Sequence, residues 1–177
     1  MMKIHKIDDS MPTKQISVLL AEDNANFRKS LKLLVELDGD IDVVGEAKNG
    51  SDAVRLTKKL RPEVIVMDIA MPLLNGLQAT RQIMDTFPST RVLILSANSD
   101  SEYVMQAVTS GASGYLIKQS STQFLPQAIR EVLKGNTYFS ASIAKALREQ
   151  CQKIFGNAEM LKKRTARLPV CESALNC

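Results

Sequence analysis

The sequence predicts an α/β fold, a doubly wound sheet of five parallel strands in the order 2-1-3-4-5 with helices on both faces. Short apolar runs alternate five times with segments whose apolar residues recur at helical spacing. Polar residues do not interrupt these runs, which is typical of strands buried on both faces of a parallel sheet. Polar residues instead follow the runs, at the edge where open α/β sheets bind ligands, and the order 2-1-3-4-5 is common at this size.

The first two strand–helix units occupy residues 16–60. Ile16 to Ala21 is predicted as a strand, and Ile41 to Val44 as the next one. After each strand, apolar residues recur on one helical face: Phe27, Leu31, Leu34 and Val35 in the first helix, and Ala53, Leu56 and Leu60 with Thr57 in the second. The second helix is expected to end at Arg61, because the residue before a proline avoids the α region.

The third and fourth units follow the same pattern. Glu63 to Met67 is predicted as a strand, and the helix after it runs from about Gly76 to Phe87, where a proline follows. Arg91 to Leu95 is predicted as the fourth strand. Ser99-Asp100 then offers N-caps for a helix that continues through Val108.

The fifth unit completes the predicted domain, which covers residues 15–137. Gly111 to Gly114 breaks the preceding helix, and Tyr115 to Ile117 is a short fifth strand. The last helix, from Thr122 to Lys134, has an apolar face formed by Leu125, Ile129, Val132 and Leu133.

Length and composition describe an ordinary globular protein. A chain of 177 residues has room for one domain with a proper core and a remnant, and 45% hydrophobic and 24% charged residues are usual values. No apolar run approaches the ~20 residues of a membrane span. Residues 1–14, predicted as a flexible N-terminus, lack the apolar middle of a secretion signal. A cytoplasmic protein without membrane contact is therefore expected.

The net charge of +4 lies in the C-terminal segment. Residues 145–177 hold seven Lys and Arg against three Glu, so the first 144 residues are neutral overall. All three cysteines lie there too, at spacings that match no metal site, which predicts reduced thiols: Cys151, Cys171 and Cys177. We interpret residues 138–167 as a basic helical linker.

Polar side chains stand at the ends of four predicted strands: Asp68, Glu22 with Asp23, Ser96 and Lys118. Because the carboxyl ends of parallel strands meet at one edge of the sheet, these side chains are expected to converge. A carboxylate can attack phosphorus to give an acyl phosphate, and Asp68 is the best placed of the three acids. Lys118 would pair with one phosphoryl oxygen, and Ser96 would donate a hydrogen bond to another.

The same edge predicts a magnesium site. Phosphoryl transfer needs its negative charge neutralised, usually by Mg²⁺, which prefers octahedral oxygen ligands. Asp23 and Asp68 can supply carboxylates, and Glu22 would bind through water or modulate the site. The backbone carbonyl of Ala70 is a further candidate ligand.

These residues together resemble the receiver domain of bacterial two-component response regulators. The matching segments are Val18 to Asp23, Val66 to Pro72 with Gly76, Ser96-Ala97, and Gly114 to Lys118. The resemblance covers about residues 15–137, with the strand-end positions matched in order. It implies the flavodoxin/CheY-like fold and a phosphorylation-controlled signalling protein rather than an enzyme.

By this resemblance Asp68 is the phosphoacceptor, charged by a sensor histidine kinase with Mg²⁺ as the cofactor. Ser96 and Tyr115 would form the switch pair, in which the hydroxyl moves toward the phosphoryl group and the aromatic ring turns inward. A homodimer through the first and last helices is one expected assembly. Gln119 stands where many receivers have a proline, so the strand itself has to aim Lys118 inward.

Val43 to Ala47 and Gly111 to Lys118 look most like the LuxR/NarL-type subfamily, which carries a DNA-binding helix-turn-helix output domain. Its members enter that domain through Leu-[Ser/Thr]-x-Arg-Glu, whereas Leu168 to Glu172 lacks the hydroxyl and the arginine. Such a module also needs on the order of 60 residues. Residues 168–177 are therefore expected to be a vestige of a truncated output domain, and DNA binding is expected of full-length relatives rather than of this chain.

Two other functions fit parts of the sequence. Lys162 to Arg164 with Arg167 could contact nucleic acid, which would make the chain an active DNA-binding transcriptional regulator. A haloacid-dehalogenase-like phosphatase would use Asp68 as its nucleophile. That chemistry needs a second acid two residues later, and position 70 is Ala.

Overall fold

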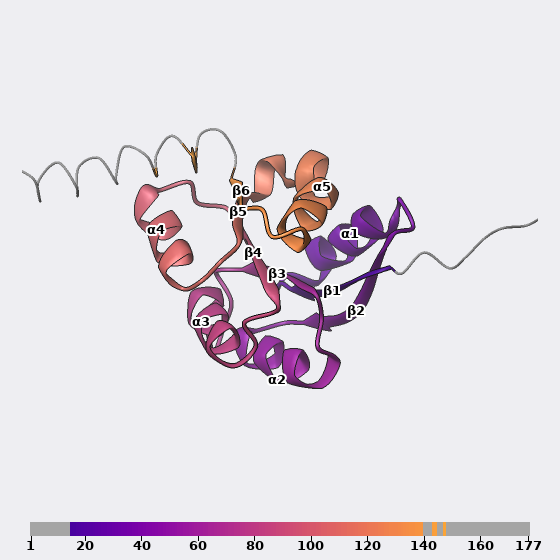
Figure 1. Cartoon of the computed structure of the whole chain (residues 1–177), viewed down its shortest axis with the longest axis horizontal. Coiled ribbons are helices and arrows are strands. Elements are labelled where there is room, and N and C mark those ends of the chain that lie inside the picture. Colours follow the sequence, from indigo (N-terminus) through magenta and orange to yellow (C-terminus); the bar gives the residue numbers. More distant parts are fainter. Residues whose placement is uncertain (1–14, 140–142, 145–146, 148–177) are drawn as a thin grey trace, which may run out of the picture.

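The computed structural model describes residues 15–139, 143–144 and 147, which contain a single parallel sheet flanked by helices (Figure 1). The strands are β1 (Ile16–Ala21), β2 (Ile41–Ala47), β3 (Val64–Asp68), β4 (Arg91–Ser96), β5 (Gly114–Ile117) and β6 (Tyr138–Phe139). The helices are α1 (Ala25–Glu36), α2 (Gly50–Leu60), α3 (Gly76–Thr86), α4 (Ser101–Thr109) and α5 (Ser121–Leu133), with a 3-10 turn η1 (Lys118–Ser120). The expectations for residues 1–14 and for the linker, cysteines and vestige beyond residue 147 lie outside the described residues.

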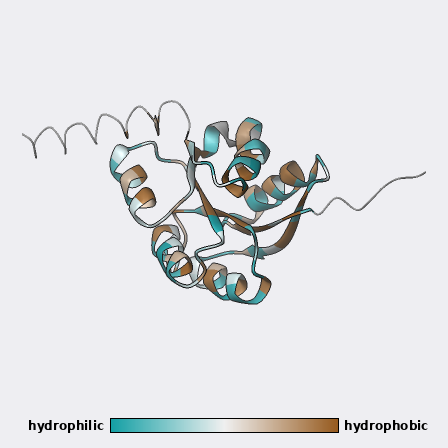
Figure 2. Cartoon of the chain, viewed as in Figure 1, coloured by the Kyte–Doolittle hydropathy of each residue, from teal (hydrophilic) through white to brown (hydrophobic). Residues whose placement is uncertain are grey.

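The predicted strand order is confirmed, since the sheet runs β2-β1-β3-β4-β5-β6 with parallel pairing. Helices α1 and α5 cover one face, and α2, α3 and α4 cover the other (Figure 1). Neighbouring residues in a strand enter different cores: Leu19 packs toward α2 to α4, and Leu20 toward α1 and α5. Figure 2 shows the matching pattern, with apolar strands and helices that are apolar on one side only. No described helix is both long and apolar enough to cross a membrane.

The sheet has a sixth strand that the sequence did not predict. β6 pairs with β5 through Gly114 opposite Tyr138 and Tyr115 opposite Phe139. Two residues are too few to give a recognisable period, so the strand follows from packing rather than from a local pattern. Ile143 is 1% exposed and belongs to the same apolar cluster as Tyr115. Tyr138, Phe139 and Ile143 therefore pack with the domain, and the predicted helical linker over residues 138–167 is wrong at its first two residues, which form a strand.

Polar caps fix the starts of the helices at the carboxyl edge of the sheet. The side chains of four N-cap residues accept hydrogen bonds from backbone N–H groups in the first turn: Asn24, Asn49, Asn75 and Asp100. The last of these confirms the predicted cap of α4. The prediction that the second helix ends at Arg61 is also confirmed, because this residue adopts a left-handed conformation with φ 50°. These short, capped loops hold the strand-end side chains in defined places.

Candidate functional site

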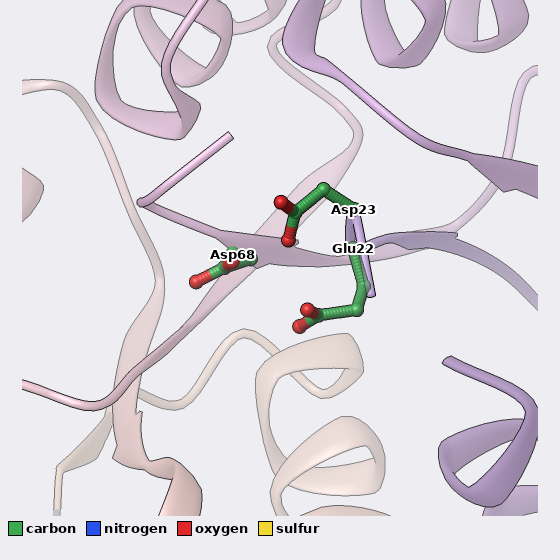
Figure 3. Close-up of side chains that lie close together, drawn as sticks. All are labelled: Glu22, Asp23 and Asp68. Carbon is green, nitrogen blue, oxygen red and sulfur yellow. The ribbon is translucent and has the colours of Figure 1, made fainter. Parts of the chain in front are cut away.

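Three carboxylates gather at the carboxyl ends of β1 and β3 (Figure 3). One oxygen from each of Glu22, Asp23 and Asp68 lies within 4.8 Å of the others. The two strands are neighbours in the sheet, with Ala21 opposite Met67, so the residues that follow are brought side by side. Glu22 and Asp68 are 1% and 3% exposed, whereas Asp23 is exposed. The cluster is thus buried beneath and open to solvent at Asp23.

Lys118, at the end of β5, reaches into this acidic cluster. Its Nζ lies 2.8 Å from Glu22 Oε2 and 3.0 Å from Asp68 Oδ2, and 5.1 Å from the centre of the Phe27 ring. Every described peptide bond is trans, so the strand aims the lysine inward although Gln119 replaces the proline of many receivers. Burial acts to lower the pKa of Lys118, but the hydrogen bonds from its ammonium to the two carboxylates outweigh it, and the pKa is raised.

The negative charges of the acidic cluster outnumber the positive charge that Lys118 brings to it. The cluster holds three carboxyl side chains and one lysine, which gives a formal net charge of −2. Burial, helped by the charge of Asp68, raises the pKa of Glu22, although hydrogen bonding to Lys118 opposes the shift. In the described part of the chain, the ion pair with Lys118 is the only polar contact of Glu22 Oε2. Under-neutralised oxygen ligands of this kind fit a hard divalent cation such as Mg²⁺.

The backbone after Asp68 is packed tightly against the start of α3. The N–H of Gly76 donates to the carbonyl of Ile69 at 3.0 Å. A Cβ added at Gly76 would lie 1.9 Å from the carbonyl oxygen of Asp68, so only glycine fits there. Ala70 lies exposed in this loop, two residues after Asp68, and its carbonyl as a metal ligand stays a prediction. The tight packing fixes the backbone that carries the Asp68 carboxylate.

The predicted switch residues lie beside the acidic cluster. Ser96 ends β4, next to the strand that carries Asp68, and its Oγ accepts a hydrogen bond from the N–H of Asn98 at 3.1 Å. Tyr115 is fully buried, and its hydroxyl donates to the carbonyl of Asn98 at 2.7 Å. Burial raises the pKa of Tyr115. The ring is therefore buried in the domain, and the role of Ser96 and Tyr115 as a switch pair stays a prediction.

Helix α1 contributes contacts that the sequence reasoning missed. The N–H of Asn24 donates to Glu22 Oε1 at 3.2 Å. Arg28 donates from Nη1 to the Glu22 carbonyl at 2.6 Å and from Nε to Glu46 Oε2 at 2.9 Å. Phe27 was placed only on the apolar face of its helix, and its ring also faces the ammonium of Lys118. Periodicity identifies apolar positions, so it gave no signal for these polar contacts.

The structure is a parallel α/β domain with an acidic cluster and a lysine at the carboxyl edge of its sheet, as the resemblance to receiver domains implies. The profile of the response regulator receiver domain matches residues 18–130. The chain belongs to the response regulator receiver domain family.

Relatives and solved structures agree with this assignment. The chain is 31% identical over 153 residues to the transcriptional regulatory protein DegU of Brevibacillus brevis, covering 86% of this chain and 65% of DegU. It is 35% identical over 133 residues to the oxygen regulatory protein NreC of Staphylococcus aureus, covering 75% of this chain and 61% of NreC. The chain thus spans less than two thirds of the length of these relatives. Among solved structures, a LuxR-family response regulator from Aurantimonas sp. SI85-9A1 superposes with a TM-score of 0.74 at 32% identity, covering 77% of this chain and 98% of the other.

Proposed function

We propose that this domain accepts a phosphoryl group on Asp68 from a sensor histidine kinase, with Mg²⁺ held by the acidic cluster. The observation that carries the proposal is the excess of negative charge at the edge of the sheet, where Lys118 pairs with the buried Glu22 and Asp68 and the exposed Asp23 lies beside them. Such an arrangement disfavours the empty cluster and favours a bound cation with a phosphoryl group.

The residues have distinct roles in this transfer. A carboxylate oxygen of Asp68 attacks phosphorus, the bond between phosphorus and the donor breaks, and an acyl phosphate forms on the aspartate. Lys118, now 3.0 Å from Asp68 Oδ2, pairs with a phosphoryl oxygen, and the Ser96 hydroxyl donates to another. Asp23, Asp68 and the backbone carbonyl of Ala70 would hold Mg²⁺, with Glu22 nearby, and the cation would neutralise the charge of the phosphoryl group.

The output of this switch is proposed from the relatives. DegU and NreC are named as regulatory proteins, DegU as a transcriptional one, so we propose that this chain descends from a transcription regulator. We also propose that it acts in the cytoplasm. Residues 15–137 would be the receiver domain, extended by the strand Tyr138–Phe139 and by Ile143 in the same core. A homodimer is the assembly through which phosphorylation would act. The phosphatase alternative is disfavoured because Ala70 occupies the place of its general acid.

The test combines intact mass with oligomeric state. Wild type, Asp68→Asn and Asp85→Asn are incubated with acetyl phosphate and Mg²⁺; Asp85 is an exposed acid on α3 and makes the matched control. One phosphoryl adduct is expected on wild type and on Asp85→Asn, and none on Asp68→Asn. An equal adduct on Asp68→Asn would refute the assignment of the acceptor. A shift from monomer to dimer on phosphorylation would support the proposed assembly.

A further inference from the structure

Arg28 links the backbone of the acidic cluster to the edge strand of the sheet. Its Nη1 donates to the carbonyl of Glu22 at 2.6 Å, and its Nε donates to Glu46 Oε2, on β2, at 2.9 Å. We propose that Arg28 is a positioning residue for the metal site: it fixes the peptide group that leads into Asp23, and so places that carboxylate beside Asp68. The inference rests on the proposed function, because it concerns the same Mg²⁺ site.

Asp23 depends on its backbone, because no described residue forms a hydrogen bond with its side chain. It is exposed, and no hydrogen bond to its carboxylate occurs among the residues that the structure describes. Its position in the cluster therefore depends on the backbone between Glu22 and Asp23. On the strand side, the N–H of Glu22 donates to the carbonyl of Ala47 at 3.0 Å. On the loop side, the carbonyl of Glu22 is held by Arg28.

The geometry suits arginine in particular. The planar guanidinium donates in two directions at once, to a carbonyl and to a carboxylate, and charge-assisted hydrogen bonds are the stronger kind. Its own backbone is fixed, because the N–H of Arg28 donates to the carbonyl of Asn24, the N-cap of α1, at 2.9 Å. The side chain is 17% exposed, so it has little freedom to leave these partners. A lysine would keep the charge and lose the two-way hydrogen bonding.

Positioning and simple electrostatics predict opposite results when Arg28 is removed. A positive charge beside a cation site repels the cation, so charge alone predicts tighter metal binding after Arg28→Met. Positioning predicts weaker binding, because the carboxylate of Asp23 is no longer held toward Asp68. The direction of the change therefore separates the two effects.

The experiment titrates the full chain with Mn²⁺, a spectroscopic probe for the Mg²⁺ site, by electron paramagnetic resonance, and then competes with Mg²⁺. Arg28→Met is expected to raise both dissociation constants about 10-fold, the usual loss when support around a metal ligand is removed. Arg55→Met is the matched control, because it removes the same charge. Arg55 is an exposed partner of Asp52 on α2 and lies outside the acidic cluster. Its affinity should stay at the wild-type value.

A second variant, Arg28→Lys, separates a loss of positioning from a loss of folding. Arg28→Lys preserves charge and stem, so a several-fold weaker affinity in this variant, with an unchanged circular dichroism spectrum, would support positioning. Unchanged or tighter binding in Arg28→Met, or wild-type affinity in Arg28→Lys, would overturn it. Failure of the proposed function looks different: wild type itself would not bind the metal, or Asp68→Asn would bind it as tightly as wild type.

Discussion

Two charged clusters lie at opposite ends of the same parallel sheet. At the carboxyl ends of the strands, Lys118 faces the acidic cluster of Glu22, Asp23 and Asp68. At the amino ends, the guanidinium of Arg130 on α5 faces two acids just before β2. It donates to both carboxylate oxygens of Asp40 at 2.7 Å and to Asp38 Oδ2 at 2.6 Å.

The two clusters differ in burial and in charge balance. Asp38 and Asp40 are 54% and 42% exposed, so water shares in their neutralisation. Hydrogen bonding to Arg130 lowers the pKa of Asp40, and the two acids raise the pKa of the arginine. At the carboxyl edge, by contrast, Glu22 and Asp68 are buried with a charge excess, and the pKa of Glu22 is raised. The amino-edge cluster thus ties α5 to the sheet, whereas the carboxyl-edge cluster keeps buried carboxylates with less cationic neutralisation, as the proposed ligand site requires.

Glycine replacements give the largest expected contrast between the two edges. Gly76→Ala puts a Cβ against the backbone of Asp68, where no side-chain movement relieves it, and should cost about 4 kcal/mol of unfolding free energy or more. Gly39→Ala, between the two amino-edge acids, meets nothing within 4 Å and costs about 1–2 kcal/mol for its left-handed φ of 78°. Urea unfolding followed by circular dichroism measures both. Equal costs would show that the backbone at Asp68 is not tightly packed.

The next contrast removes one lysine at a time. Lys118→Met leaves two buried carboxylates without their cation and should lower the unfolding free energy by about 2–3 kcal/mol, somewhat less than for a fully buried pair because Lys118 is 22% exposed. Added Mg²⁺ should restore part of this loss. Lys134→Met, which breaks an exposed pair with Glu131, should leave the unfolding free energy close to that of wild type. Urea unfolding with and without Mg²⁺ measures both variants. Comparable losses of unfolding free energy in Lys118→Met and Lys134→Met would show that Lys118 does not neutralise a buried charge excess.

The smallest contrast concerns the amino-edge cluster. Arg130→Met should cost about 1 kcal/mol in urea unfolding at neutral pH and low salt, since the paired acids are well over a third exposed. The pKa of Asp40 is lowered in the folded state, so its contribution is present above its usual value of 3.8 and is lost as the pH falls below it. The difference between variant and wild type should therefore shrink toward pH 3 and at high salt. If the difference in unfolding free energy between Arg130→Met and wild type grew in acid, the ion pair with Asp40 would not be its source.

Much of this fold could be predicted from the sequence, because buried parallel strands and amphipathic helices leave strong local patterns. The strand-end argument also predicted that Glu22, Asp23, Asp68 and Lys118 converge, since parallel strands end at one edge. The third strand runs one residue further than expected and includes Asp68 itself.

The rest depends on contacts between residues that are distant in the sequence or carry no periodic signal. The pairing of Arg130 with Asp40 spans 90 residues, and nothing local marks either partner. The strand Tyr138–Phe139 exists only because β5 offers it an edge. The two partners of Arg28 likewise become visible only when β1, β2 and α1 are packed together.

Urea unfolding of wild type and Asp68→Asn, each in EDTA and in saturating Mg²⁺, measures whether the carboxyl-edge cluster holds excess charge for a ligand. In EDTA we expect the unfolding free energy of Asp68→Asn to exceed that of wild type by about 1 kcal/mol, because one buried charge is gone and Glu22 still pairs with Lys118. Mg²⁺ at about 100 times its dissociation constant should then stabilise wild type by about 2.7 kcal/mol and the variant much less. If Asp68→Asn is less stable than wild type in EDTA and gains as much unfolding free energy from Mg²⁺, the cluster does not hold excess charge for a ligand.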